Sequence, residues 1–387
     1  MNTQKVIPLW FLAMLTLTGT VAMHLFIPVL PLIAEDLHAN LSQVQLTLSA
    51  YIIGLAVGQL FYGPLADTIG RRPVLIVGML IYALSSFGAM FAEHLGLLIG
   101  FRFLQALGGC SGLLLGRTIV RDTTQGNETT KKLSLMNMMV ILGPGLSPII
   151  GGLLASLSGW RSLFFALSMV GLLNLFLIWL YISDQNLQRA TTAKKVLEHY
   201  RKLIRSPKFI GYTISGGLAT TSIYAFLSVA SFIVIHQLHG SLHQVSVYLA
   251  LTMVGMWFGS FASNRLIDRF SLDNLLRLGS GISLLSSLVL FGCIFLGYLN
   301  SYTLVIPIII YCFGAGISSP AALTKALNSN PVVAGSASGI YGFFQMLIGA
   351  ICTLLSGLGT NPAFSAACVL LGACLIVQIC LKVARSV

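Results

Sequence analysis

Two basic side chains stand inside long apolar stretches of the sequence, where charge is rare. Arg102 lies within the run 95–119 and His24 within the run 7–34. An arginine at the centre of a spanning helix costs roughly 2.5–3.5 kcal/mol on insertion scales, so it usually faces a cavity or a partner. An unperturbed imidazole titrates near pH ~6.5 and can exchange a proton under physiological conditions. With Gln105, one helical turn after Arg102, these side chains are candidates to line a cavity that binds a small molecule and a proton.

Both residues also have a plain structural interpretation. Arg102 could serve packing alone, and His24 could be a core histidine bonded to a backbone carbonyl. None of the ten acidic residues lies in the middle of an apolar run. If His24 does not carry the proton, Glu35 and Asp36 at the end of the first run are the remaining candidates.

The elements that must position these side chains are membrane-spanning helices. The 387 residues are 56% hydrophobic and 8% charged, with a mean hydropathy of +0.90, whereas soluble domains are about 25% charged. This composition excludes a soluble enzyme, a nucleic-acid-binding domain and a disordered scaffold. A span needs about 20 apolar residues. Twelve runs meet that requirement: 7–34, 42–65, 73–92, 95–119, 132–156, 162–182, 209–236, 244–267, 275–296, 302–324, 335–357 and 362–382.

The polar stretch between the sixth and seventh runs predicts two six-helix halves. We expect an N-terminal half at 1–182, a cytoplasmic linker at 183–208 and a C-terminal half at 209–387. With both termini in the cytoplasm, all but two of the 22 Lys and Arg residues face the cytoplasm or lie at that end of a helix, as the positive-inside rule requires. The seven cysteines show no metal-ligand spacing, so we expect neither a disulfide framework nor a metal site. No cofactor is expected.

The strongest local pattern lies between the second and third runs. It reads Gly63-Pro-Leu-Ala-Asp67-Thr-Ile-Gly70-Arg71-Arg72. Glycine permits a tight turn, and we expect Asp67 at the start of the third helix, where the helix dipole favours a carboxylate. A weaker copy at 259–269 supports repeated halves. The pattern predicts a charged turn that ties helix ends together in one conformational state.

Two further patterns lie in the fourth and fifth runs. The fourth run is followed by Arg121 and Asp122. The fifth run carries closely spaced prolines and glycines: Pro144, Pro148, Gly151 and Gly152. Prolines bend a helix, and glycines admit a close neighbour, although ordinary helix packing by small residues would also account for this pattern.

Together these segments resemble exporters of the major facilitator superfamily, and specifically the bicyclomycin/chloramphenicol-resistance type of drug:proton antiporter. The resemblance implies an all-α membrane protein with twelve transmembrane helices in two six-helix halves. It implies a cytoplasmic gate formed by Gly63, Asp67, Gly70, Arg71, Arg72, Arg121 and Asp122. It also implies an antiporter-type kink in the fifth helix, at the prolines and glycines just named. Within this family the sequence departs at one place, since His24 occupies a position that is acidic in the resembled exporters.

We therefore expect a proton-driven secondary transporter, not an enzyme, that exports drug-like molecules or metabolites by alternating access from the bacterial inner membrane. The alternative is a dedicated exporter of an anionic or polar metabolite, such as a carboxylate siderophore. An importer is less well supported, and a channel is disfavoured by the repeated halves and the exporter-type loop. An intramembrane enzyme is disfavoured because HExxH and GxSxG motifs are absent, and the absence of a P-loop argues against ATP hydrolysis. The expected partners are a small-molecule substrate, protons and membrane lipids, with no nucleic acid, and the chain is expected to be a monomer.

The charge of the substrate stays open at this stage. A cavity with Arg102 and no acid favours neutral, zwitterionic or anionic compounds over dications. Antiport, however, requires the proton and the substrate to compete, which favours a neutral or cationic compound.

Overall fold

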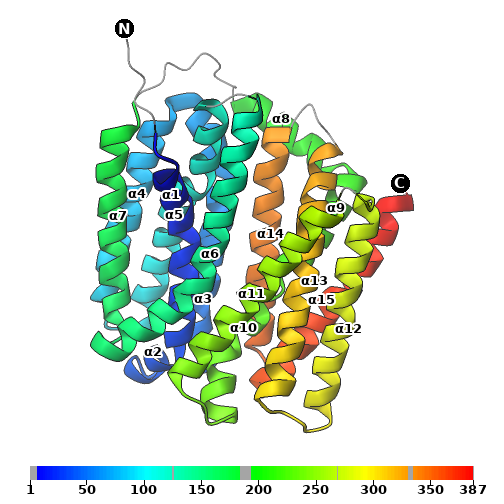
Figure 1. Cartoon of the computed structure of the whole chain (residues 1–387). Helices are drawn as coiled ribbons and strands as arrows, with labels where there is room; N and C mark the ends of the chain where they lie inside the picture. Colours follow the sequence, from blue (N-terminus) through cyan, green and yellow to red (C-terminus); the bar gives the residue numbers. More distant parts are fainter. Residues whose placement is uncertain (1–6, 124–125, 184–192, 268, 330–333, 387) are drawn as a thin grey trace.

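The computed structural model describes residues 7–123, 126–183, 193–267, 269–329 and 334–386. Within these ranges the chain is almost entirely helical and contains no β-strand (Figure 1). The helices of the first half are α1 (Leu9–Phe26), η1 (Ile27–Val29), α2 (Leu30–Asp36), α3 (Leu41–Ile69), α4 (Arg71–Met90), α5 (Leu95–Thr123), α6 (Gly126–Ser158) and α7 (Arg161–Tyr181). Helix α8 (Ala193–Ile204) follows, and then come α9 (Pro207–Thr221), α10 (Tyr224–Phe232), η2 (Ile233–Gln237), α11 (Leu242–Leu266), α12 (Leu272–Phe295), α13 (Ser301–Asn328), α14 (Ala334–Ser356) and α15 (Pro362–Ser386).

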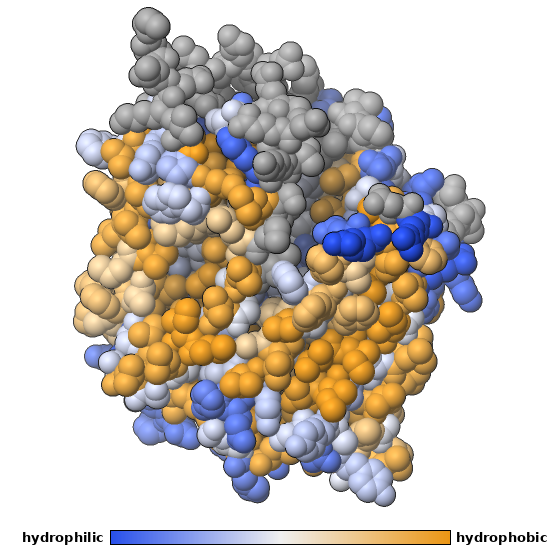
Figure 2. Space-filling model, in the orientation of Figure 1, coloured by the Kyte–Doolittle hydropathy of each residue, from blue (hydrophilic) through white to orange (hydrophobic). Residues whose placement is uncertain are grey.

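The predicted all-α fold with twelve transmembrane helices is confirmed. Among the described residues, 11 helical segments are long and apolar enough to cross a membrane, and α6 contributes a shorter apolar segment, Leu142–Ser158. Apolar residues cover a broad surface over the middle of the molecule, and polar residues gather toward its ends (Figure 2). This distribution suits a protein whose flanks face lipid.

The first and seventh spans are interrupted at corresponding places in the two halves. In the first span, η1 separates α1 from α2 and contains Pro28, whose ring removes a backbone donor. In the seventh span, α9 ends at Thr221 and α10 begins at Tyr224. Thr220 and Thr221 donate back to the carbonyls of Gly216 and Gly217 at 2.7 and 2.8 Å. Such back-bonding competes with the helix ladder and bends helices.

The two halves pack side by side with both termini at the same end (Figure 1). Within the first half α5 packs on α1, α3 and α4, and within the second α13 packs on α9, α11 and α12. The most extensive contacts between the halves are those of α3 with α14 and of α6 with α11, and α10 adds smaller ones with α2, α3 and η1. We call the end that holds the chain termini the terminal end, and the other the distal end. The boundaries at 1–182, 183–208 and 209–387 remain a proposed division.

Candidate functional site

Arg102 lies in α5 and is completely buried inside the first half. Its Nη1 donates to Gln105 Oε1 at 2.6 Å and to the carbonyl of Ala22 at 3.4 Å. The guanidinium carbon lies 4.2 Å from the ring centroid of Phe26 and 4.0 Å from that of Tyr51. Aromatic faces attract a cation more strongly where water is excluded. The contacts therefore hold the charge in place through two rings and one amide.

The guanidinium of Arg102 has further donors that no acceptor contacts. Gln105 is itself fixed, because its Nε2 donates to Ser86 Oγ at 2.7 Å. Arg102 Nε and Nη2 have no hydrogen-bond partner. A buried donor without a partner costs free energy, so an acceptor that reached these two nitrogens would be bound favourably.

His24 lies in α1 and faces the other half of the protein. Its Nδ1 is 2.9 Å from the carbonyl of Thr20, one turn earlier. A carbonyl only accepts, so Nδ1 carries the hydrogen and Nε2 is the ring atom that can take up a further proton. The ring meets Tyr224 of α10 edge-on, with centroids 6.5 Å apart. His24 therefore lies at a contact between the first span and the seventh.

The structure does not bring His24 and Arg102 together. Ala22 and Phe26, which contact Arg102, are one turn apart on the same face of the first span. His24 lies two residues from each, about 200° around a helix. The sequence made both side chains candidates to line the same cavity. Arg102 instead lies against one face of the first span, in the core of the first half, whereas His24 points from the opposite face of that span toward the second half.

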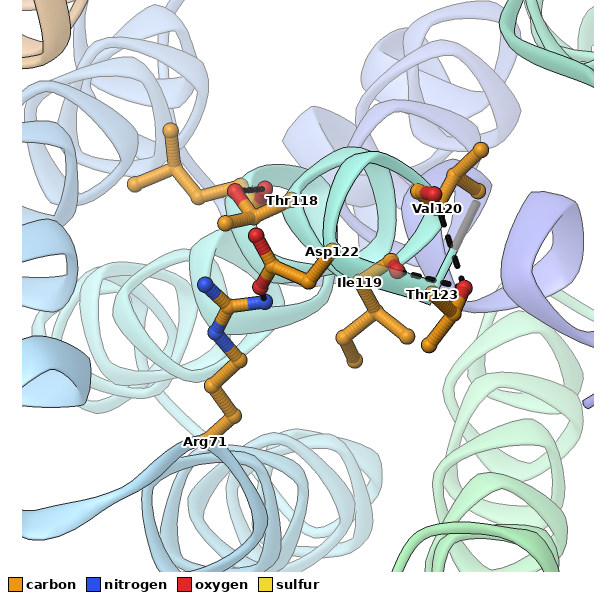
Figure 3. Close-up of polar contacts among 7 residues, drawn as sticks. Arg71, Thr118, Ile119, Val120, Asp122 and Thr123 are labelled. Carbon is orange, nitrogen blue, oxygen red and sulfur yellow. Dashed lines mark hydrogen bonds and ion pairs between the residues drawn. The ribbon is translucent and has the colours of Figure 1, made fainter. Parts of the chain in front are cut away.

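The charged turn at the terminal end contains an ion pair. Arg71, the first residue of α4, pairs with Asp122 near the end of α5, and the two side chains point toward each other (Figure 3). Gly70 separates α3 from α4 with φ 100°, a conformation that favours glycine. Asp67 lies in the last turn of α3, not at the start of the next helix as expected, because α3 continues through Pro64 and ends only at Gly70.

The other predicted gate residues have different surroundings. A Cβ at Gly63 would meet nothing within 4 Å, so space does not require glycine there in this state. Arg72 is the second residue of α4 and is partly buried. The side chain of Arg121 lies outside the part of the chain whose side chains the structure describes.

The predicted kink lies where α6 meets two neighbours. Pro144 and Pro148 both lie inside this helix. A Cβ at Gly151 would overlap with the carbonyl of Leu25 in α1, and one at Gly152 would overlap with Ser246 Oγ in α11. Gly151 therefore lets α6 pack closely on α1 of its own half, and Gly152 lets α6 pack closely on α11 of the other half.

Sequence reasoning missed the polar contacts between the halves at the distal end. Ser42 donates to the carbonyl of Gly357, and Gln45 Nε2 donates to Ser228 Oγ at 3.1 Å. Ser231 Oγ donates to the carbonyl of Ile27 at 2.8 Å. Buried glutamine and serine within apolar runs were the available signal. These contacts are uncharged, so parting them exposes no buried ion.

Asp36, a fallback candidate for proton coupling, is engaged at the distal end of the first half. Its Oδ2 accepts from Trp160 Nε1 at 3.1 Å and from Arg161 Nη1 at 2.7 Å. Both donors lie at the turn between α6 and α7. This carboxylate thus ties the end of the first span to that turn.

Comparison with known proteins gives the family. The Major Facilitator Superfamily model matches residues 9–353. A bicyclomycin resistance protein homolog of Haemophilus influenzae is 26% identical, covering 98% of this chain and 96% of that protein. Multidrug resistance protein D of Escherichia coli is 30% identical, covering 90% and 88%. These relatives confirm the resemblance to the bicyclomycin/chloramphenicol-resistance type.

Solved structures agree on the fold. A crystal structure of a D-xylose-proton symporter superposes with a TM-score of 0.75 at 14% identity, covering 95% of this chain and 96% of that one. A bacterial homolog of the human lysosomal transporter Spinster gives 0.76 at 15% identity, covering 98% and 95%. The chain therefore belongs to the Major Facilitator Superfamily, and it is a multi-pass membrane transporter, not an enzyme.

Proposed function

We propose that this protein is a proton-driven exporter of small drug-like molecules that works by alternating access. The relatives named for multidrug, bicyclomycin and chloramphenicol resistance match nearly the whole chain. The observation that carries the proposal is the seam between the halves. It is built from glycine contacts and neutral hydrogen bonds, such as that of Gln45 with Ser228, which rocking halves can make and break.

The proposed location is the bacterial inner membrane, with the terminal end in the cytoplasm. Exposed cations at that end include Arg117, Arg201, Lys202, Arg205 and Lys208. The positive-inside rule favours this orientation. The distal hydrogen bonds then form a closed outer gate, and the turn with Arg71 and Asp122 belongs to the inner gate.

Coupling to protons is assigned to His24. Its Nε2 is the free proton site, and its ring contacts Tyr224 in the opposite half. A movement of the halves changes that contact, so the environment of the imidazole changes with the transport cycle. Burial and solvent exposure favour different protonation states of the same group. The proton is thereby taken up in one state and released in the other.

The substrate is proposed to be neutral. The described residues that are buried include Arg102 and His24 but no Asp or Glu. No carboxylate in the described core would therefore balance the charge of a dication. Protonated His24 would attract an anion, whereas antiport requires protonation to release the substrate. A neutral compound avoids both problems, and Gln105 offers a polar group beside Arg102.

A dedicated exporter of an anionic metabolite remains the second candidate. The observation in its favour is the pair of unbonded donors on Arg102, which suit a carboxylate. An anion bound there would use Nε and Nη2 together.

Everted membrane vesicles test these proposals. Vesicles energised with an inward-acid gradient are given one neutral, one cationic and one carboxylate compound, with and without an uncoupler. We expect uptake of the neutral compound that stops with uncoupler. Uptake of the carboxylate alone would establish the second candidate, and uptake that persists in uncoupler would contradict proton-driven export.

A further inference from the structure

Helix α8 is attached to the first half at a carbonyl that the sequence leaves unbonded. In an uninterrupted helix the carbonyl of Leu60 would accept from the N–H of residue 64. Residue 64 is proline, which has no N–H. The hydroxyl of Tyr200 in α8 donates to this carbonyl at 3.0 Å. Burial raises the pKa of Tyr200, so the phenol keeps its donor hydrogen at neutral pH.

The same hydroxyl reaches the second half. It lies 3.6 Å from the position of a Cβ built at Gly339 of α14. Leu203, also in α8, is completely buried, and α8 packs on α9 and α14. One face of α8 is therefore fixed over the junction of α3 and α14, at the terminal end of the molecule (Figure 1).

The opposite face of α8 is basic and exposed. Arg201, Lys202 and Arg205 are exposed there, beside the exposed Glu198. Ile204, which is 52% exposed, lies about 60° around the helix from Arg201, on the flank toward Tyr200. Lys208, just beyond the helix, is exposed as well. Among the described residues no carboxylate forms an ion pair with any of the four cations. The exposed side of α8 thus combines a net positive charge with one uncovered apolar side chain on its flank.

This face lies directly before the start of a candidate membrane span. The spanning segment Pro207–Gln237 starts three residues after α8 ends. Arg205 and Lys208 stand on either side of that start. A lipid surface beside this span takes both the cations, at its phosphates, and the apolar side chain of Ile204.

We propose that α8 is a docking surface for anionic phospholipid head groups, which its cations bind while Ile204 enters the interface. Docked α8 keeps Tyr200 on the Leu60 carbonyl and so holds α3 beside α14. The surface rests on the proposed cytoplasmic placement of the terminal end, since an anionic inner leaflet attracts basic segments there. It does not depend on the substrate or on proton coupling.

Hydrogen–deuterium exchange on the full chain in nanodiscs tests this surface without measuring transport. One set of discs contains phosphatidylcholine alone and a second contains phosphatidylcholine with phosphatidylglycerol. We expect backbone amides of 198–205 to exchange on the order of tenfold more slowly with phosphatidylglycerol, because each cation near the surface adds about fivefold to binding. High salt should remove the difference.

Matched variants make the result specific. The triple change Arg201→Gln, Lys202→Gln and Arg205→Gln should abolish the effect of phosphatidylglycerol. The control variant loses the same charge at three arginines that are exposed at the same end of the second half: Arg265, Arg269 and Arg277. The effect of phosphatidylglycerol should persist in this variant. Tyr200→Phe should speed the exchange of α8 in both kinds of disc.

Three outcomes would overturn the lipid surface. One is equal exchange in both discs for the unaltered protein, and another is an undiminished effect in the α8 triple variant. The third is equal protection from inorganic phosphate added to discs of phosphatidylcholine alone. Failure of drug export in the vesicle assay would leave the exchange result unaffected, so the two proposals fail separately.

Discussion

Lys325 donates to Asp273 at 2.6 Å in the second half. This pair occupies the place that the pair of Arg71 and Asp122 occupies in the first half. Asp273 lies in the first turn of α12 and Lys325 in the last turn of α13. In the first half the cation begins α4 and the acid ends α5. The two halves therefore carry the same bridge between corresponding helices with the charges exchanged. The bridge holds helix ends at the terminal end of both halves.

Neutralising the first-half bridge should slow transport without unfolding the protein. Both partners are partly exposed, so the pair contributes about 0–1 kcal/mol, which corresponds to a shift of up to roughly fivefold in a two-state equilibrium. Asp122→Asn and Arg71→Gln should each lower the transport rate severalfold. The exchanged pair, Arg71→Asp with Asp122→Arg, should recover part of that loss.

Transport rates in vesicles and melting temperatures in detergent check this expectation. Glu93→Gln is the matched control, because Glu93 is exposed at the distal end. Unchanged transport in both single variants would show that the bridge is not part of the gate.

Enlarging Gly152 should block the cycle at the seam. A leucine side chain would collide with Ser246 of α11, and overpacking typically costs about 1–3 kcal/mol. We expect inserted protein with little export. Gly100→Leu is the control, since a Cβ there meets nothing within 4 Å. Equal export by the two leucine variants would show that α6 and α11 need not pack closely.

Arg102→Lys should impair export despite the retained charge. An ammonium cannot stack between Phe26 and Tyr51 or reproduce the planar donors that bond Gln105 and remain free on Nε and Nη2. We expect a higher KM together with a lower kcat, measured in proteoliposomes. Arg102→Ala should lower the melting temperature as well. Wild-type kinetics in the lysine variant would show that charge alone matters at this position.

His24→Gln should separate export from the proton gradient. Glutamine keeps a polar side chain but does not titrate between pH 5 and 8, roughly the range of an imidazole. Export by the unaltered protein should depend on external pH, and export by this variant should not. His24→Asp, which restores the acid of the resembled exporters, should return a pH dependence. His243→Gln, an exposed histidine, is the control. Should the glutamine variant keep full coupling, Glu35 becomes the candidate to test.

Hydropathy predicted the fold because spanning helices are defined by composition. It placed the fifth span at 132–156, whereas α6 begins at Gly126, since a helix can extend beyond the lipid without apolar residues. It could not show the interruption between Thr221 and Tyr224, which arises from hydroxyls bonding back to the helix. The pattern of apolar residues along the sequence does not reveal such competition.

The candidate site was predictable only where a single residue is unusual for the stretch of sequence around it. Arg102 and His24 stand out because ionisable groups are rare in apolar runs. Tyr224, Tyr200 and Lys325 gave no such signal, because their significance comes from partners 52 or more residues away. The relation of His24 to Arg102 was also hidden, since it depends on which face of the first span each residue meets.

The most direct measurement of proton-driven export follows protons and substrate in the same proteoliposomes. A pH-sensitive dye inside the vesicles reports proton movement while a neutral substrate moves down an imposed concentration gradient, with no other energy source. We predict proton flux in the direction opposite to the substrate, lost in His24→Gln. Substrate flux without proton movement, or with protons moving in the same direction, would contradict the account.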